Sequence, residues 1–345
     1  MRAPSWLVFV ACAGACARAG AGPESAATAA APPPPALSAS AAGAATPSAP
    51  ATAVASPPPE AALHCDATPR AIGRIQDPQL DEISGVVESR KDPRVLFVHN
   101  DSGDSPRFFA IDRSGQLLAE LVLETVPLLL DAEEIAIGPG PGGAQFIYLG
   151  DTGNNLASLG LGIARRKAVL YRIAEPDVAL GWRGQKLAVH EAFPIVFSFP
   201  KGARDIEAFF VDPQTGDLTL ISKQPDGHSQ ILGASAAMLA AGGGELTLLG
   251  ELRFGQAPLT GSSMPTAASI SRDGSAVLVR TYSSVFLFRR RQGESVLSAL
   301  SRAPEVEPSP KEPQGEAISF ASGDSAFVTI SEGVKPPLYC AALKP

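Results

Sequence analysis

The feature that most constrains the fold is a short pattern that returns along the chain: an acidic residue, an apolar run, a turn, and another apolar run. Four segments have the acidic start, and a fifth has the same frame with Ala268 in the acidic position. The five segments are LDEISGVV (80–87), DAEEIAIG (131–138), DIEAFFVD (205–212), TAASISRDG (266–274) and QGEAISFA (314–321). Short apolar runs separated by turns rich in Gly, Pro and Asp are typical of β-strands.

This repeat predicts an all-β fold, a β-propeller in which each repeat forms one four-stranded blade. The aligned acidic positions are Asp81, Glu133, Glu207, Ala268 and Glu316. Too few residues follow Glu316 for a complete blade, so we expect the N-terminal strand, about residues 63–76, to complete the last blade beside residues 336–342. Five blades are the main prediction, and six are the alternative if the stretch 156–204 holds an extra blade.

The N-terminus has the pattern of an export signal. Arg2 precedes the apolar run WLVFVACAGA (6–15), and Cys16 follows small residues, as in a bacterial lipoprotein signal whose cysteine is lipidated. Cys12 is a second candidate for lipidation. The alternative is an ordinary secretory signal over residues 1–16 with incidental cysteines.

Residues 17–62 are almost entirely Ala, Pro, Ser, Thr and Gly. Such a segment buries too little apolar surface to offset its ordering entropy, and its proline runs favour extended chain. We therefore expect a disordered tether between the signal and a propeller domain at residues 63–345. Behind a lipid anchor, this tether holds the domain away from a membrane, in the periplasm or on the outer surface; without the anchor, the protein is secreted.

The two remaining cysteines, Cys65 and Cys340, lie at the two ends of the propeller domain. In an exported protein an even pair favours a disulfide, and two unrelated thiols are the alternative. In a closed ring, this bridge would join adjacent strands of the last blade. Closure removes exposed sheet edges, so we expect a monomer.

The charge and the motifs exclude several functions. The chain has 345 residues and a net charge of −7, which argues against nucleic acid as a partner because phosphate binding needs a basic surface. The sequence has no Gly-x-Ser-x-Gly elbow, no Walker A loop and no His-Glu-x-x-His motif, and its four histidines lack metal-ligand spacing. No catalytic residue is identified from these motifs.

Two acidic turns indicate a shared site. VHNDSGD (98–104) and YLGDTGNN (148–155) both end an apolar run in Asp, Ser or Thr, Gly, and Asp or Asn. We expect Gly103 and Gly153 to allow positive φ. Across the repeats, the residues that end the second strand are Asp101, Asp151, Lys223, Arg280 and Glu332. Because antiparallel neighbours bring this end beside the start of the inner strand, where Asp131 and Asp205 also lie, all these side chains are predicted to converge on one mouth of the channel.

Three interpretations of this mouth remain open. The first is an internal network in which Lys223 and Arg280 neutralise the carboxylates. The second is a divalent cation, Ca²⁺ above all, because hard cations take carboxylate and amide oxygens. The third is catalysis or anionic-ligand binding, with paired carboxylates as acid and base. The candidate ligand-binding residues are Asn100, Asp101, Asp104, Lys223, Arg280 and Glu332.

Several phrases resemble exported bacterial β-propellers of the SMP-30/gluconolactonase, NHL and phytase-like groups. They include DEISGVVESRKDPRVLFVHNDSGD, IYLGDTGNN, DIEAFFVDPQTGDLTLISK and QGEAISF, and the similarity covers about residues 78–335. The resemblance implies Ca²⁺ at the channel mouth. The matching metal ligands are Asp101, Glu133, Asp151 and Glu207. Ala268, Lys223 and Arg280 depart from a cage built of carboxylates alone.

Together these observations predict a membrane-tethered propeller of the cell envelope that binds a small molecule or an envelope protein at an acidic funnel, with Ca²⁺ as the candidate cofactor. One alternative is a metal-dependent hydrolase acting on a phosphoester or lactone in the same funnel. The other is a purely structural envelope protein.

Overall fold

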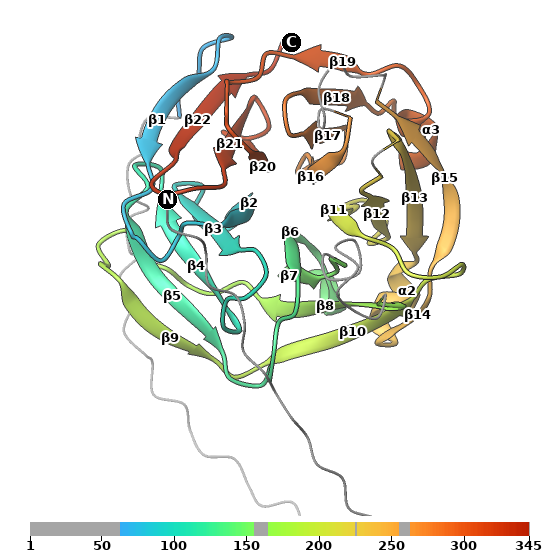
Figure 1. Ribbon diagram of the computed structural model, residues 1–345, viewed down its shortest axis with the longest axis horizontal. Helices are drawn as coiled ribbons and strands as arrows, with labels where there is room; N and C mark the ends of the chain where they lie inside the picture. Colours follow the sequence, from blue (N-terminus) through green and yellow to red (C-terminus); the bar gives the residue numbers. More distant parts are fainter. Residues whose placement is uncertain (1–62, 155–164, 225, 255–262, 345) are drawn as a thin grey trace, which may run out of the picture. The chain divides into compact units, whose positions relative to one another are not determined.

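The computed structural model describes residues 63–154, 165–224, 226–254 and 263–344. They form five mainly antiparallel sheets arranged around a central channel (Figure 1). The prediction of a five-bladed β-propeller is confirmed, and the six-bladed alternative is wrong. The expected signal, both candidate lipidation sites Cys12 and Cys16, and the tether lie outside the described residues. Within those residues, no helix has the length and apolar character needed to cross a membrane.

In each blade one strand lies beside the channel, and the other strands follow it outward in the order of the sheet. The inner strands are β2 (Ile83–Glu88), β6 (Ala132–Pro139), β11 (Ile206–Val211), β16 (Pro265–Ile270) and β20 (Gly315–Ala321). The second strands are β3 (Val95–Asn100), β7 (Gln145–Asp151), β12 (Leu218–Ser222), β17 (Ala276–Thr281) and β21 (Ala326–Ser331). The third strands are β4 (Arg107–Asp112), β8 (Lys167–Ala174), β13 (His228–Ala234), β18 (Val285–Arg289) and β22 (Pro337–Ala342). The fourth strands are β5 (Leu117–Leu123), β10 (Ala192–Ser198), β15 (Thr247–Arg253), β19 (Glu305–Glu307) and β1 (Arg70–Arg74).

Two additional strands cover outer edges in place of an extra blade. Strand β9 (Gln185–Val189) follows β8 of the second blade but pairs in parallel with β5 of the first. Strand β14 (Gly243–Glu245) pairs in parallel with β10. Both strands satisfy backbone groups that an edge would otherwise expose. The short helices are η1 (Pro141–Gly143), α2 (Ala236–Ala240) and α3 (Val296–Leu300).

The hydrophobic core consists of five clusters, each between two neighbouring blades. Side chains alternate along a strand, so β3 sends Phe97 toward the second blade and Val98 toward the last. Between the second and third blades, Tyr148 packs with Phe209. Burying each such side chain contributes about 1.5–3 kcal/mol, so the ring is held by contacts that no blade makes alone.

The ring closes where the sequence predicted. Strand β1 pairs antiparallel with β22, with Arg70 opposite Cys340, so the N-terminal strand completes the last blade. The disulfide between Cys65 and Cys340 is present and joins positions 275 residues apart. It packs in the apolar cluster that joins the last blade to the first, beside Ile75 and Leu80.

All five inner strands contain a β-bulge at the same position. The bulged residues are Ser84, Glu133, Glu207, Thr266 and Glu316. The sequence alignment is therefore corrected in two blades: Ser84, not Asp81, and Thr266, not Ala268, correspond to the three glutamates. Asp81 lies three residues before the bulge of its blade and Ala268 two residues after, because the alignment followed acidic residues and spacing rather than the bulge that all five strands share.

Candidate functional site

Three of the five bulged residues are glutamates that meet at one end of the channel. This end, the acidic mouth, is defined by six carboxylates: Asp101, Asp131, Glu133, Asp205, Glu207 and Glu316. Bulges are frequent beside functional sites because they re-aim a side chain. Here three equivalent bulges, rather than three separate motifs, gather the glutamates.

The carboxylates form two groups that share Glu133. One group contains Asp101, Asp131 and Glu133, and the other contains Glu133, Asp205 and Glu207. Within each group, one oxygen from every residue lies within 4.8 Å of the others. Asp131 and Asp205 stand at equivalent positions, since each carbonyl accepts the backbone N–H of the residue after the second strand, Thr152 at 3.0 Å and Lys223 at 2.9 Å. The two groups thus repeat one local geometry in adjacent blades.

The other two bulged residues are hydroxyls that join blades. Ser84 donates to the Glu133 carbonyl at 3.0 Å, and Thr266 donates to the Gly315 carbonyl at 2.9 Å. In the second blade, Thr152 donates to the Ile206 carbonyl at 2.8 Å. Ser84 and Thr266 lie in inner strands and Thr152 follows β7, and each donates to the inner strand of the next blade, so the rim around the carboxylates is cross-linked by hydrogen bonds.

The two glycines of the acidic turns serve different purposes. Gly103 has the expected positive φ, at 89°. Gly153 does not; a Cβ there would lie 2.0 Å from Oε1 of Glu133 and 2.6 Å from Oδ2 of Asp131. Gly153 is needed because the turn passes directly over two carboxylates.

Lys223 lies inside the acidic mouth. Its Nζ is 2.8 Å from Oε1 of Glu207 and 5.1 Å from the centre of the Tyr282 ring. Tyr282 follows β17 as Lys223 follows β12, so Tyr282, not Arg280, is the equivalent residue in the fourth blade. The sequence analysis missed Tyr282 because the alignment in that blade was displaced.

Arg280 has a structural position. Its guanidinium is 2.6 Å from Glu312, and both side chains are only 1% exposed. It also donates to the Ala317 carbonyl at 2.9 Å. A Cβ on Gly315 would overlap the guanidinium, so that glycine makes room for the pair. Arg280 therefore pairs with Glu312 rather than with the two carboxylate groups, and its charge only partly offsets the effect of burial on the pKa of Glu316.

Asp151 is also directed away from the two groups. It is buried, ion-pairs with Arg165 at 2.8 Å, and accepts the backbone N–H of Asp131 at 3.0 Å. Thr152 occupies the position that Asp101 has in the first blade. Asp151 thus positions the backbone of a carboxylate residue instead of joining the carboxylate groups.

The other predicted ligand residues form separate contacts. Asn100 donates to Asp104 at 3.1 Å, and Asp104 pairs with Arg107 at 2.8 Å. Glu332 accepts a hydrogen bond from the side chain of Gln314. Gln314 also donates to Glu316 at 3.1 Å, and the charge of Glu332 acts on Asp101 and Glu316, so of the six residues predicted to bind a ligand, Asp101, Lys223 and Glu332 lie at the mouth.

Burial and mutual repulsion make the carboxylates harder to ionise. Burial raises the pKa of Asp101 to about 7, assisted by repulsion from Asp131. Burial also raises the pKa of Glu316 to about 7. Burial, then repulsion from Glu207, raises the pKa of Glu133 well above its usual range. The site therefore favours an added positive charge.

Lys223 supplies part of that charge. Burial lowers its pKa, but attraction to Glu207, Tyr282 and Glu316 together outweighs burial and raises the pKa above its ordinary value. For Glu207, burial raises the pKa and Lys223 opposes the effect without cancelling it. One ammonium group is thus shared among several carboxylates.

The donor set fits a hard divalent cation. All the grouped ligand atoms are carboxylate oxygens, which Ca²⁺ and Mg²⁺ prefer. Oε2 of Glu316 is buried and has no hydrogen-bond partner among the described residues. Asp131 and Asp205 lie two residues before Glu133 and Glu207. They complete the two carboxylate groups, in which the resemblance had placed Asp151 as a ligand.

Glu134, which follows the bulged Glu133, links two inner strands. Its Oε2 accepts the backbone N–H of Ala268 at 2.8 Å, so the side chain of β6 reaches across to β16 of the fourth blade. Its Oε1 accepts the N–H of Ile135 at 3.0 Å. Glu134 is completely buried and belongs to the fold rather than to the open site.

Comparison with known proteins adds little to this geometry. No protein family and no curated protein matches the chain. Among solved structures, the chain is similar to the one titled "Structure of U3-55K", with a TM-score of 0.40 and 11% identity over 81% of this chain and 100% of that chain. The grouping with SMP-30, NHL or phytase-like propellers stays a prediction.

Proposed function

We propose that this protein is an envelope-tethered β-propeller that binds a divalent cation, Ca²⁺ by preference, at its acidic mouth and holds a ligand or partner against it. The observation that carries the proposal is the sharing of Glu133 between two carboxylate groups. Buried carboxylates with raised pKa values destabilise the fold unless a cation or protons neutralise them. A bound cation relieves this repulsion at neutral pH.

Calcium binding is tested by titration of the metal-stripped full chain in a calorimeter, with elemental analysis of the purified protein. Glu133→Gln keeps the side-chain shape and removes the charge common to both groups, so we expect calcium affinity to fall at least tenfold. Glu251→Gln, on the exposed strand β15, is the matched control and leaves affinity unchanged. Absence of calcium binding, or equal affinity in Glu133→Gln, contradicts the proposal and favours a structural envelope protein.

The position of Lys223 and Tyr282 supports a second candidate, a metal-dependent hydrolase of phosphoesters or lactones. An ammonium group and a phenol beside carboxylates can hold an anionic group and transfer protons. In a screen of both substrate classes with Ca²⁺, Lys223→Met and Tyr282→Phe should reduce turnover while calcium uptake is kept. If neither class is turned over by the wild type, the site is a binding site.

The anchor is tested separately from the site. In the full chain expressed in a bacterium, Cys16→Ser should move the protein from the membrane fraction to the soluble exported fraction. Cys12→Ser is the control that leaves it at the membrane. If Cys16→Ser stays in the membrane fraction, Cys16 is not the anchor.

A further inference from the structure

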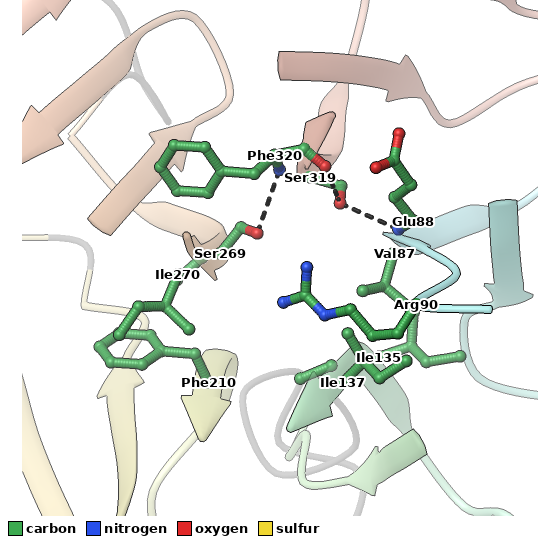
Figure 2. Close-up of a pocket in the computed structure, with 12 residues that line it drawn as sticks. Val87, Glu88, Arg90, Ile135, Ile137, Phe210, Ser269, Ile270, Ser319 and Phe320 are labelled. Carbon is green, nitrogen blue, oxygen red and sulfur yellow. Dashed lines mark hydrogen bonds between the residues drawn. The ribbon is translucent and has the colours of Figure 1, made fainter. Parts of the chain in front are cut away.

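The opposite end of the channel has a different character. There the inner strands end, and a pocket is lined by residues of all five blades, among them Val87, Ile135, Phe210, Ser269 and Phe320. Figure 2 shows the guanidinium of Arg90, which follows β2, directed into the middle of this ring of side chains. We call this end the arginine mouth.

The side chain of Arg90 has no hydrogen bond or ion pair with the described residues, although its backbone N–H donates to Glu175 at 2.9 Å. Arg90 and Arg272 both line an adjoining cleft of about 230 Å³, together with Gln145 and Gly138. Since one water occupies about 30 Å³ of liquid, the cleft has room for roughly seven waters or a small ion.

Arg272 is only partly satisfied. It donates to the Ser89 carbonyl at 3.0 Å and approaches Glu88 at 3.4 Å. Its Nε is buried and has no hydrogen-bond partner in the described part of the chain. An arginine presents five donors in a rigid fork, so both guanidiniums keep donors for a further acceptor.

We propose that the arginine mouth binds a phosphate group, free or as a phosphomonoester, between the guanidiniums of Arg90 and Arg272, with the Gln145 amide at the rim. Two forks match the oxygens of a tetrahedral dianion, and charge-assisted bidentate bonds are the strong class of hydrogen bond. Burial lowers the pKa of Arg90 and repulsion from Arg272 adds to the effect, so an anion between them relieves this repulsion.

The nearby acidic groups do not fill this role. Glu175 accepts the Ser89 hydroxyl and the backbone N–H groups of Arg90 and Lys91. Asp324 accepts the backbone N–H of Arg272 at 2.7 Å. Glu175 thus holds the loop that carries Arg90 and Asp324 holds the turn that carries Arg272, while the side chain of Arg90 is left for a ligand.

The test is calorimetric titration of the full chain with inorganic phosphate and, in a second arm, glycerol phosphate. We expect saturable binding of at least one, and the tighter ligand tells whether the group is taken free or as an ester. Arg90→Met suits the apolar walls around it and should weaken binding at least tenfold. Arg90→Lys should bind with intermediate affinity, and Arg253→Gln, on β15, is the control that binds as the wild type does.

Absence of saturable binding of either compound at roughly 10 mM, where a site of millimolar affinity is mostly filled, overturns the proposal. Equal affinity in the wild type, Arg90→Met and Arg272→Met also overturns it, because the ion would then bind elsewhere. Circular dichroism should show that the Arg90→Met protein is folded. A loss of phosphate binding then reports the site rather than unfolding. Calcium binding at the acidic mouth stays unchanged in these variants.

Discussion

The two mouths of one channel give buried carboxylates different partners. At the arginine mouth, Glu88 pairs with Arg113 at 3.2 Å and with Arg272 at 3.4 Å, and it accepts the backbone N–H of Ser322 at 3.2 Å. At the acidic mouth, carboxylates lie close to other carboxylates, and the ammonium group of Lys223 contacts Glu207. Carboxylates that repel one another favour an added positive charge, so the acidic mouth is where we expect a cation.

The largest expected effect concerns pH. Asp101 and Glu316 have folded pKa values of about 7, above their ordinary values, so the folded metal-free protein binds more protons than the unfolded chain between about pH 4 and 7. Its free energy of unfolding should therefore fall as the pH rises through this window. Burial lowers the pKa of His99 to about 4, which acts in the opposite direction below pH 6.5. For these three groups together the loss corresponds to about 4 kcal/mol.

Urea unfolding of the EDTA-treated protein at a series of pH values measures this loss. Added Ca²⁺ should restore stability at pH 7.5 and have little effect at pH 4, where protons occupy the carboxylates. A metal-free protein that becomes more stable from pH 4 to 7 would show that the two mouths do not differ in this way.

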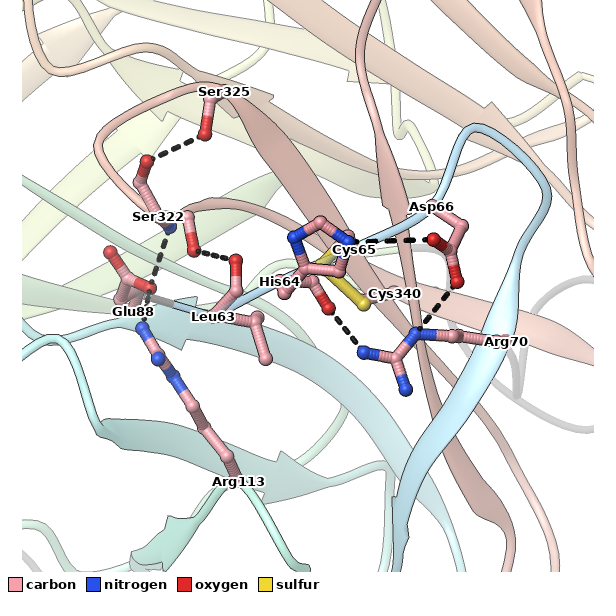
Figure 3. The surroundings of a disulfide bond; sticks show 10 residues. All are labelled: Leu63, His64, Cys65, Asp66, Arg70, Glu88, Arg113, Ser322, Ser325 and Cys340. Atoms are coloured by element: carbon pink, nitrogen blue, oxygen red, sulfur yellow. Dashed lines mark hydrogen bonds and ion pairs between the residues drawn. A yellow bond between two sulfur atoms is a disulfide. The ribbon is translucent and has the colours of Figure 1, made fainter. Parts of the chain in front are cut away.

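The second effect concerns ring closure, which is tied to the arginine mouth. Figure 3 shows Leu63, two residues before Cys65. Its carbonyl accepts a hydrogen bond from the Ser322 hydroxyl, and the backbone N–H of Ser322 donates to Glu88. Replacing Cys65 and Cys340 by serine should lower the free energy of unfolding by about 2–4 kcal/mol. In the variant that lacks both cysteines, phosphate affinity should fall more than calcium affinity. Calorimetric titration of this variant and of the wild type with each ligand measures the two changes. Equal losses at both mouths would mean that closure supports the whole ring uniformly.

The third effect is a matched pair of substitutions with opposite signs. Glu88→Gln removes a charge that two arginines need and should lower stability by about 1–3 kcal/mol. Glu133→Gln removes a charge that repels its neighbours and should raise the stability of the metal-free protein at pH 8 by about 1–2 kcal/mol. Thermal unfolding of both metal-free variants and the wild type measures the two changes in stability. If both substitutions destabilise equally, Glu133 is as well neutralised as Glu88.

The sequence predicted the fold because the blade repeat is a local signal. Turns and apolar runs identified the five blades, and the incomplete repeat after Glu316 predicted closure by the N-terminal strand, which placed Cys65 beside Cys340. The site was only partly predictable, because the ends of the second strands were aligned by residue type and spacing. Asp151 lies one residue before, and Arg280 two residues before, the position that Asp101 holds in the first blade. Hence Asp101, Asp131, Glu133, Asp205 and Glu207 were expected at the mouth where the structure has them, whereas Tyr282 was missed.

Glu134 has a consequence for the coupling between blades. Its carboxylate accepts a backbone N–H of its own strand, β6, and a backbone N–H of β16 in the fourth blade. One side chain therefore connects two blades that are not neighbours in the ring, so shortening it should affect the unfolding of the whole ring rather than of one blade.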